Sequence, residues 1–227
     1  MKIISDNSSY TSMNEFAPIL AIETSGDLCS VCVYQSSSLF SEINIQRKHI
    51  HSELLMTLVE QCISNMGVNK AELKSVAVSM GPGSFTGLRI GMSVAKSIAF
   101  GLQLPIIAVP TYEALAYFIL KLNFEISRIC IVNKVNRDEL YMQKFDIDNL
   151  SLSPQEIQLI KSDQITEIDE SYNIYGNLDH SKVTLLNSPS SLSISEWAYI
   201  FGQDLVTFDY DYLEPNYIKN FIAKVKK

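Results

Sequence analysis

The stretch "MGPGSFTGLRIGMSVAKSIAFG", residues 80–101, begins with closely spaced glycines and a proline and continues as a helix-like sequence. It lies between two short apolar runs, "LKSVAVSM" at 73–80 and "LPIIAVP" at 104–110, each typical of a buried strand. A strand, a helix and a second strand in this order predict a crossover unit of an α/β fold. The glycine-rich start has three interpretations: a phosphate-binding loop, a tight strand-to-helix turn, or part of a contact with another chain.

The glycine-rich turn does not match the two common phosphate-binding fingerprints. A P-loop requires Gly-Lys-Ser/Thr, which this turn lacks, and the glycines of 81–87 are one residue out of register with G-x-G-x-x-G. A helix amino terminus can still attract an anion. The interpretation that we favour is a tight turn in which Gly81 and Gly83 adopt positive φ. Ser84 or Thr86 then caps the helix.

The helix after the turn carries a stripe of small residues. Gly87, Gly91 and Ala95 recur every four residues, and Ala99 continues the row. A glycine inside a helix costs about 1 kcal/mol relative to alanine, so we expect a compensating contact. A stripe without bulky side chains lets another backbone approach closely, either from the same chain or from a partner.

The composition is that of a globular protein with a sizeable core. Of the 227 residues, 47% are hydrophobic and 19% are charged. The net charge of −7 argues against a surface that binds a phosphate backbone unaided. No run of 18 apolar residues predicts a membrane span, and the polar first 17 residues do not resemble a secretion signal.

The cysteines indicate reduced, packing thiols. Cys29 and Cys32 have C-x-x-C spacing, but they lie in "DLCSVCVYQ", whose alternation is typical of a strand. Residues three apart on a strand point to opposite faces, so the two thiols cannot form a redox or zinc pair. Reduced cysteines fit a cytoplasmic protein.

No catalytic or metal-binding residue is predicted. His49 and His51 are two residues apart, whereas a zinc-binding helix needs histidines at i and i+4 and a third ligand. The remaining histidine, His180, lies in a polar segment far along the chain. Ser84 is one residue out of place for a nucleophile elbow.

The chain is predicted to form two lobes, each a mixed sheet with helices. Three strands in 18–47 are predicted to form an antiparallel meander. Helices are predicted at 51–67 and 111–123. Ser52 and Thr111 are their candidate N-cap residues, and Gly67 is expected to end the first of them. From Ser127 a weaker α/β pattern begins, with a helix at 194–205. We assign 1–17 to a flexible extension, 18–115 to the first lobe and 116–227 to the second, whose last helix can return to the first lobe.

Several segments in this order resemble the TsaB family, also called YeaZ. They are "ILAIETSGDLCSVCVY", "RKHIHSELLMTLVEQ", the run from "VAVSMGPGSFTGLR" to "PTYEALA", and "EPNYIK" near the end. The string "GPGSFTGLR" is highly specific to that family. The likeness is thinner from Ser127 onward, where "KVNRDELY" has Lys134 at the position of a family aspartate.

The resemblance implies an actin-like, two-lobed fold and a non-catalytic subunit for forming N6-threonylcarbamoyladenosine at position 37 of tRNAs reading ANN codons. It implies a TsaD-like catalytic partner, a TsaE-like ATPase, tRNA contact only through the complex, no cofactor of its own, and ATP at the level of the complex. Partner contact is expected through the helices at 52–66 and 86–101, and a homodimer is expected to use the same face. The implied interface residues are Leu54, Leu58, Phe85, Gly87, Leu88, Gly91, Met92 and Ala95.

The loop after the first strand leaves a second hypothesis open. Glu23, Thr24, Ser25 and Gly26 keep the outline of the loop that positions metal and phosphates in actin-like ATPases. The alternative to a vestigial nucleotide loop is a strand-end turn in which Thr24 and Ser25 bond the local backbone. A working site here would make the chain a nucleotide-binding ATPase or phosphotransferase.

Overall fold

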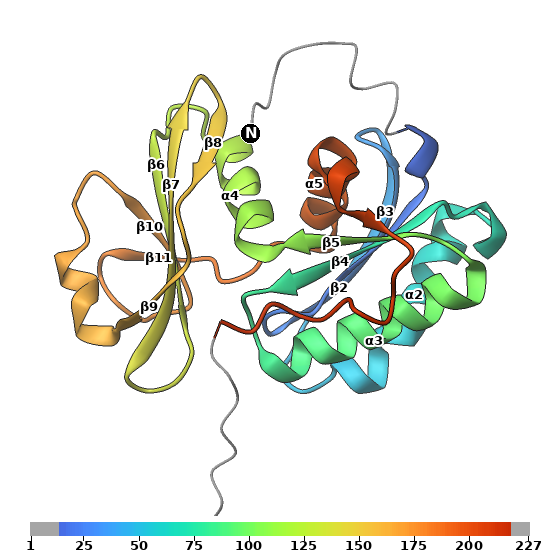
Figure 1. Ribbon diagram of the computed structural model, residues 1–227, viewed down its shortest axis with the longest axis horizontal. Coiled ribbons are helices and arrows are strands. Elements are labelled where there is room, and N and C mark those ends of the chain that lie inside the picture. The colour runs from blue at the N-terminus through green and yellow to red at the C-terminus, as the bar shows by residue number, and fades with distance from the viewer. Residues whose placement is uncertain (1–13, 219–227) are drawn as a thin grey trace, which may run out of the picture.

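The computed structural model describes residues 14–218, which form two lobes side by side, each built on one sheet (Figure 1). The first sheet has the strand order β12-β5-β4-β1-β2-β3, and the second has the order β11-β10-β6-β7-β8 with β9 paired to β7. This confirms the predicted two-lobed α/β fold.

The first lobe begins with the predicted antiparallel meander, because alternating apolar residues favour paired strands. β1, β4 and β5 then pair in parallel, as crossover connections require. Helices α2 and α3 cover one face of this sheet, and α4 and α5 cover the other (Figure 1). The elements are β1 (Ile19–Glu23), β2 (Leu28–Ser36), β3 (Leu39–Gln46), α2 (His51–Met66), η2 (Lys70–Glu72), β4 (Ser75–Gly81), α3 (Phe85–Leu102), β5 (Ile106–Pro110) and α4 (Thr111–Leu122).

Two of the predicted helix caps are wrong. α2 has Ile50 as its N-cap residue, without a side-chain cap, so Ser52 lies inside the helix. α4 starts at Thr111 itself, and the Thr111 hydroxyl accepts a 3.0 Å hydrogen bond from Gly81 N–H instead of capping. Gly67 does end α2, with φ of 72° as predicted.

The second lobe begins only after α4. Because α4 runs without interruption from Thr111 to Leu122, a boundary between residues 115 and 116 falls inside a helix that links the two lobes. The remaining elements are β6 (Arg128–Lys134), β7 (Glu139–Asp148), β8 (Ser151–Pro154), β9 (Gln158–Lys161), η3 (Ser162–Glu167), β10 (Asn173–Gly176), β11 (Val183–Leu185), α5 (Ser191–Phe201), η4 (Gly202–Leu205) and β12 (Val206–Thr207).

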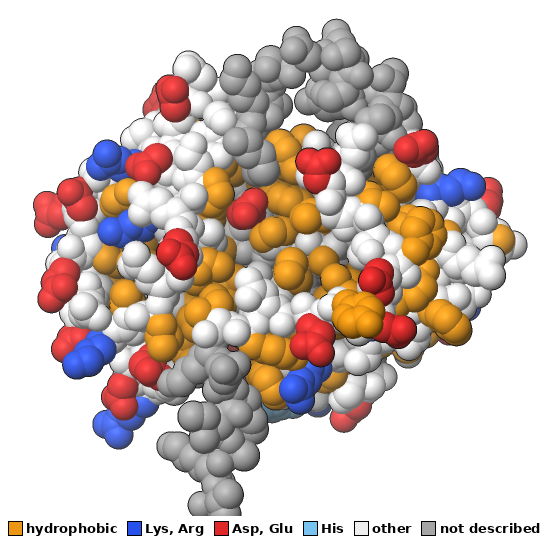
Figure 2. Space-filling view, in the orientation of Figure 1, with side chains coloured by type: hydrophobic (Ala, Val, Ile, Leu, Met, Phe, Trp, Pro, Cys, Tyr) orange, Lys and Arg blue, Asp and Glu red, His pale blue; other side chains and the backbone are white. Residues whose placement is uncertain are grey.

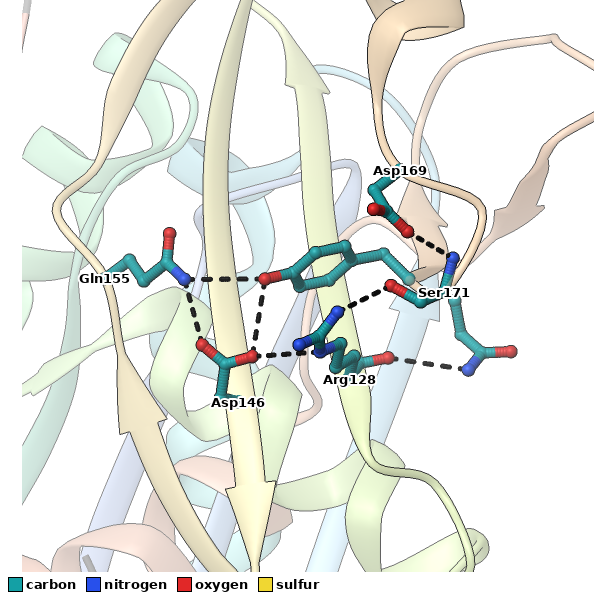
Figure 3. Close-up of polar contacts among 7 residues, drawn as sticks. Arg128, Asp146, Gln155, Asp169 and Ser171 are labelled. Atoms are coloured by element: carbon teal, nitrogen blue, oxygen red, sulfur yellow. Dashed lines mark hydrogen bonds and ion pairs between the residues drawn. The ribbon is translucent and has the colours of Figure 1, made fainter.

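A polar cluster on the second lobe ties the segment before β10 to the central strands (Figure 3). Arg128 Nη1 donates to Ser171 Oγ at 2.8 Å, and Arg128 Nε lies 3.3 Å from Asp146 Oδ1. Gln155 Nε2 donates to Asp146 Oδ2 at 2.9 Å. Both partners of the ion pair are nearly half exposed, so the pair contributes little to the free energy of unfolding. The cluster mainly holds the segment before β10 against the sheet.

Helix α5 comes late in the chain but packs on the first lobe. Its amino end is held by Glu42 of β3, whose Oε1 accepts from Leu192 N at 2.7 Å and from Ser191 Oγ at 3.2 Å. Ser30 of β2 accepts from Ser191 N at 2.8 Å. At its other side, Glu196 pairs with Lys121 of α4 at 2.6 Å. Its position after Ser127 in the sequence predicts a place in the second lobe, whereas these contacts fix it between α4 and the first sheet.

Both ends of the described chain contact the first lobe. Asn14–Phe16 forms the short 3-10 helix η1, and Ser75 Oγ donates to Phe16 O at 2.8 Å, so this part of the predicted flexible extension is packed. Residues 208–218, which we call the strap, run back along α3 (Figure 1). The rest of the predicted extension lies in 1–13, outside the described residues. Of the C-terminal segment 214–225, in which the last helix was expected, residues 214–218 form no helix and the rest lies outside the described residues.

Cys29 and Cys32 lie in hydrophobic clusters on opposite faces of the first sheet, as the strand interpretation predicts. The four cysteines are buried and free. No helix within residues 14–218 is long and apolar enough to cross a membrane.

Candidate functional site

The glycine-rich turn joins β4 to α3 and touches the loop after β1. Gly81 has φ of +108°, as predicted, and the Gly81–Pro82 peptide is cis. Gly83 does not have positive φ; a Cβ atom there would lie 2.6 Å from the Ser25 carbonyl oxygen. Gly83 is therefore needed for close backbone approach and not for a left-handed conformation. Ser84 is the N-cap residue, and its Oγ accepts from Gly87 N at 3.2 Å.

The small face of α3 is filled by the chain itself. A Cβ atom at Gly87 would lie 2.0 Å from Thr24 O, and one at Gly91 would lie 2.2 Å from Thr24 Oγ1. Ala95 is fully buried in the core beneath the helix. The contact that compensates for two helical glycines is therefore the end of β1, not a partner subunit.

This packing corrects much of the predicted interface. Six of its residues are buried within the first lobe and cannot reach a partner in this conformation: Leu58, Gly87, Leu88, Gly91, Met92 and Ala95. Leu54 and Phe85 are half-buried and remain accessible in part. The stripe of small residues correctly identified the closely packed face of α3. This face packs against the end of β1, however, and not against a partner subunit.

The accessible apolar surface lies on the flank of α3. Ile90, Val94 and Ile98 are half-buried and spaced four residues apart, so they form one ridge along the helix. The strap occupies the opposite flank, where Arg89, Met92 and Lys96 line a groove beneath it. We call the residues Ile90, Val94 and Ile98, together with Leu54 of α2, the helix ridge.

The loop after β1 holds a buried carboxyl group. Glu23 is fully buried, its Oε1 accepts from Ser25 N at 2.5 Å, and its Oε2 has no hydrogen-bond partner among the described residues. Burial raises the pKa of Glu23 to about 7, although the nearby hydroxyls of Ser25 and Ser79 oppose the rise. Thr24 Oγ1 donates to Gly87 O at 2.8 Å, so this hydroxyl serves packing with α3.

The two lobes enclose a cleft of about 1590 Å³, which we call the interlobe cleft. Its first-lobe wall comprises Ser25–Asp27, Gly83–Thr86 and Leu88, together with Asn216 and Tyr217 of the strap. Its floor and second-lobe wall include Tyr112, Asn133–Glu139, Tyr141, Lys161–Asp163, Asn177 and Asn187. Glu23, in contrast, does not line the cleft, so the predicted loop presents only Ser25 and Gly26 there.

The sequence did not predict the contacts that the strap makes. Arg89 Cζ lies 3.9 Å from the Phe85 ring centroid, and Arg89 Nε donates to Tyr217 Oη at 2.9 Å. Asn216 N donates to Met80 O at 2.7 Å. Figure 2 shows hydrophobic side chains where the strap crosses α3, with Asp and Glu side chains around them. The only sequence signal was "EPNYIK", which suggested a return to the first lobe without naming a contact.

The comparisons with known proteins agree with this architecture. A sequence model of the family "TsaD: tRNA N6-adenosine threonylcarbamoyltransferase" matches residues 39–174, more than half of the chain and parts of both lobes. The TsaB protein of Haemophilus influenzae is 24% identical over 90% of this chain and 94% of its own length. This chain belongs to the TsaD family, in its TsaB (YeaZ) branch.

Further TsaB relatives are more nearly identical over a shorter aligned stretch. The TsaB protein of Escherichia coli is 32% identical over 98 residues, which cover 43% of this chain and 42% of that protein. The solved structure of YeaZ from Pseudomonas aeruginosa has a TM-score of 0.72 at 19% identity, covering 87% of this chain and 99% of that one. The structural likeness confirms a TsaB fold across both lobes, including the second lobe, where the sequence likeness is thin.

No group of three or more His, Cys, Asp and Glu residues within 14–218 is placed to hold a metal ion. His51, two residues after His49, is buried, and its Nε2 lies 3.3 Å from Leu28 O. The histidine therefore contacts the first sheet. In this TsaB-family chain the accessible features are the helix ridge, the strap and the interlobe cleft.

Proposed function

We propose that this chain is a non-catalytic subunit for the formation of N6-threonylcarbamoyladenosine at position 37 of tRNAs that read ANN codons. It stabilises and activates a TsaD-like catalytic subunit, and it acts in the cytoplasm. A TsaE-like ATPase joins the assembly, tRNA is contacted only through the complex, and the chain holds no cofactor of its own, with ATP used by the complex. The observation that carries the proposal is the alignment with a TsaB protein over nearly the whole length of both chains.

The helix ridge supports the docking of a partner on α2 and α3. Ile90, Val94 and Ile98 are apolar, and each is partly accessible on the surface of the first lobe. A second helix pair laid along this ridge would bury it, because residues four apart form a continuous row. In the absence of a partner, a second copy of the chain uses the same ridge.

The experiment is co-purification with a TsaD-like subunit from the same cell. Val94→Glu places a charge on the ridge and should abolish capture, because an unpaired charge cannot be buried in the contact. Leu159→Glu is the matched control, since Leu159 is 41% exposed on β9 of the second lobe and should leave capture unchanged. Capture of the folded Val94→Glu variant at wild-type levels would show that the ridge is not the docking surface.

The second candidate is a nucleotide-binding ATPase or phosphotransferase. The observation in its favour is that Ser25, Gly26 and the start of α3 face the interlobe cleft. Calorimetry with Mg-ATP separates the candidates. Micromolar binding of Mg-ATP to the isolated chain favours the enzyme, and the absence of heat favours the subunit.

A further inference from the structure

The carboxyl end of α3 carries an exposed aromatic surface. Phe100, near the end of the helix, is 73% exposed, and Phe208 and Tyr212 of the strap are 63% and 86% exposed. Tyr210, between the latter two, donates from its hydroxyl to Leu104 O at 2.6 Å, and its ring centroid lies 6.2 Å from that of Phe100. Exposed apolar surfaces rimmed by polar residues mark interaction sites. We call Phe100, Phe208, Tyr210 and Tyr212 the aromatic patch.

The aromatic patch lies among carboxylates without a counter-ion. Residues 204–214 contain no Lys, Arg or His, and their acidic residues are Asp204, Asp209, Asp211 and Glu214. All four are exposed, and none forms an ion pair within the described part of the chain. Arg89 and Lys96 of α3 line the groove beside Glu214 without pairing with it. The helix end adds negative potential, because α3 has no basic residue in its last turn.

A lysine-rich segment follows the strap directly. Residues 219–227, "KNFIAKVKK", contain four lysines and no acidic side chain. A lysine ammonium group is attracted both to a carboxylate and to the face of an aromatic ring. The apolar side chains of Phe221, Ile222 and Val225 suit an aromatic surface as well. The segment therefore matches the aromatic patch in charge and in apolar content.

The segment is also long enough to return to the patch. The strap is anchored on α3 where Tyr210 Oη lies 3.5 Å from Ala99 O and where Tyr217 bonds Arg89. These two helix positions are ten residues apart, which is about 15 Å along the axis. Asn220 favours a chain reversal. The seven residues after it span about 23 Å when extended, which is enough to run back over the strap.

The interlobe cleft is the other surface within reach, because Asn216 and Tyr217 line its rim. Its charges are mixed: the lining cations are Lys134, Arg137 and Lys161, and the lining carboxylates are Asp27, Asp138, Glu139 and Asp163. A lysine-rich segment would therefore meet three like charges in the cleft, whereas residues 204–214 contribute only carboxylates. The charge pattern favours the aromatic patch over the cleft.

We propose that residues 219–227 fold back along the strap and bind the aromatic patch of the same molecule. Lys224, Lys226 and Lys227 pair with the carboxylates of 204–214, and their ammonium groups and Val225 cover the exposed rings. The occupied surface lies on the strap side of α3 and leaves the helix ridge free. This contact goes beyond the subunit role and does not depend on it.

The test is a paramagnetic NMR measurement on the full chain. Val225→Cys carries a nitroxide label and keeps all four lysines of the segment. The four native cysteines are buried, so the label attaches to the introduced one. The amide signals of Phe100, Phe208 and Tyr210 should be lost, and they should return when ascorbate reduces the label. Signals of 214–218 do not count, because these residues directly precede the segment.

Charge-neutral variants show whether the carboxylates select the segment. Asp209→Asn combined with Asp211→Asn should restore the Phe100 and Phe208 signals. Salt at 1 M should do the same, because it shortens the screening length to about 3 Å. The matched control is Asp138→Asn combined with Asp163→Asn, which removes as many charges from the cleft and should leave the signal loss unchanged.

Three results would overturn the proposal. Signal loss at Asn136 and Asn177 instead of the patch would place the segment in the interlobe cleft. Unchanged signals throughout, or a loss that persists in the Asp209→Asn, Asp211→Asn variant, would show that the carboxylates do not hold it. Loss in a mixture of spin-labelled chains with separate isotope-labelled chains would show that a second copy supplies the segment.

The proposed function is tested separately. A chain that lacks residues 219–227 should capture the TsaD-like partner normally, because the helix ridge is unchanged. Failure of the NMR test is therefore distinct from failure of the subunit assignment.

Discussion

The Thr24 hydroxyl donates a 2.8 Å hydrogen bond to the Gly87 carbonyl, so the end of β1 lies directly against the small face of α3. A Cβ atom at Gly87 would be 2.0 Å from Thr24 O, which is backbone and cannot rotate away. The glycines of α3 thus allow a helix to sit on the strand end that borders the interlobe cleft. These glycines are therefore required for the packing of the first lobe, and replacing them should change its stability.

Gly87→Ala should destabilise the protein although alanine is the better helix former. The clash with Thr24 O requires the helix to move, which costs about 1–3 kcal/mol, more than the gain of about 1 kcal/mol in helix propensity. Urea denaturation measures the difference. Gly101→Ala is the control on the same helix: no atom lies within 4 Å of its added Cβ, so stability should rise by about 0.5–1 kcal/mol. A stabilised Gly87→Ala variant would contradict the packing described here.

Gly91→Leu should fail by unfolding and not by blocking a partner. Its Cβ alone would lie 2.2 Å from Thr24 Oγ1, and the larger side chain has no space between α3 and β1. Circular dichroism melting should therefore show loss of a cooperative transition or a much lower midpoint. If the Gly91→Leu variant instead stays folded as a monomer and fails only to bind its partner, the glycine stripe would be an interface after all.

Stability should fall as pH rises from about 5 to 7 because of Glu23. Its pKa is raised from 4.5 to about 7 by burial, so the folded protein holds a proton that the unfolded chain has lost in this range. The stabilisation is complete below the unfolded pKa and is lost as pH rises through the folded pKa, with an upper limit of about 3 kcal/mol. Glu23→Gln cannot ionise. Its advantage over the wild type should grow from pH 5 to 7 and level off above, whereas parallel curves would refute the assignment.

Glu42→Ala should loosen α5 from the first lobe. The carboxylate accepts from Leu192 N at 2.7 Å and Ser191 Oγ at 3.2 Å, so its removal leaves the amino end of α5 uncapped. The expected loss is about 1–2 kcal/mol in urea denaturation. Glu60→Ala removes a carboxylate from an exposed pair with Lys70 at 3.4 Å and should change stability by less than about 0.5 kcal/mol. Equal effects of the two changes would show that Glu42 is not a cap.

Tyr217→Ala should release the strap while the rest of the protein stays folded. Tyr217 stacks on Phe85 with ring centroids 4.8 Å apart and bonds Arg89, so truncation removes the main contact at that end. Hydrogen exchange should accelerate at Asn216, whose N–H bonds Met80 O, and the loss of global stability should be near 1 kcal/mol. Tyr212→Ala, at 86% exposure on the same strap, should leave exchange unchanged. Unchanged protection in both variants would mean that Tyr217 does not hold the strap.

Much of the fold followed from local patterns. The meander of β1, β2 and β3 and the crossover through α3 were predicted because periodicity and turn residues act over a few neighbouring residues. The predicted division of Cys29 and Cys32 between the two faces of a strand is also confirmed. The caps at Ser52 and Thr111 were wrong, because a hydroxyl near a helix start can bond elsewhere, as Thr111 does to Gly81.

The TsaB-like order of elements and the stripe of small residues on one helix follow from the amino-acid sequence alone, since both depend only on residue type and spacing. The neighbour that fills that stripe is visible only in the folded chain, because small side chains indicate that another segment packs closely but do not identify the segment. Tyr112 and Asn133 are another example. They are 21 residues apart in the sequence, and both line the interlobe cleft only because of how the two lobes are packed. Contacts between distant segments depend on how the sheets and helices pack, and no local pattern records them.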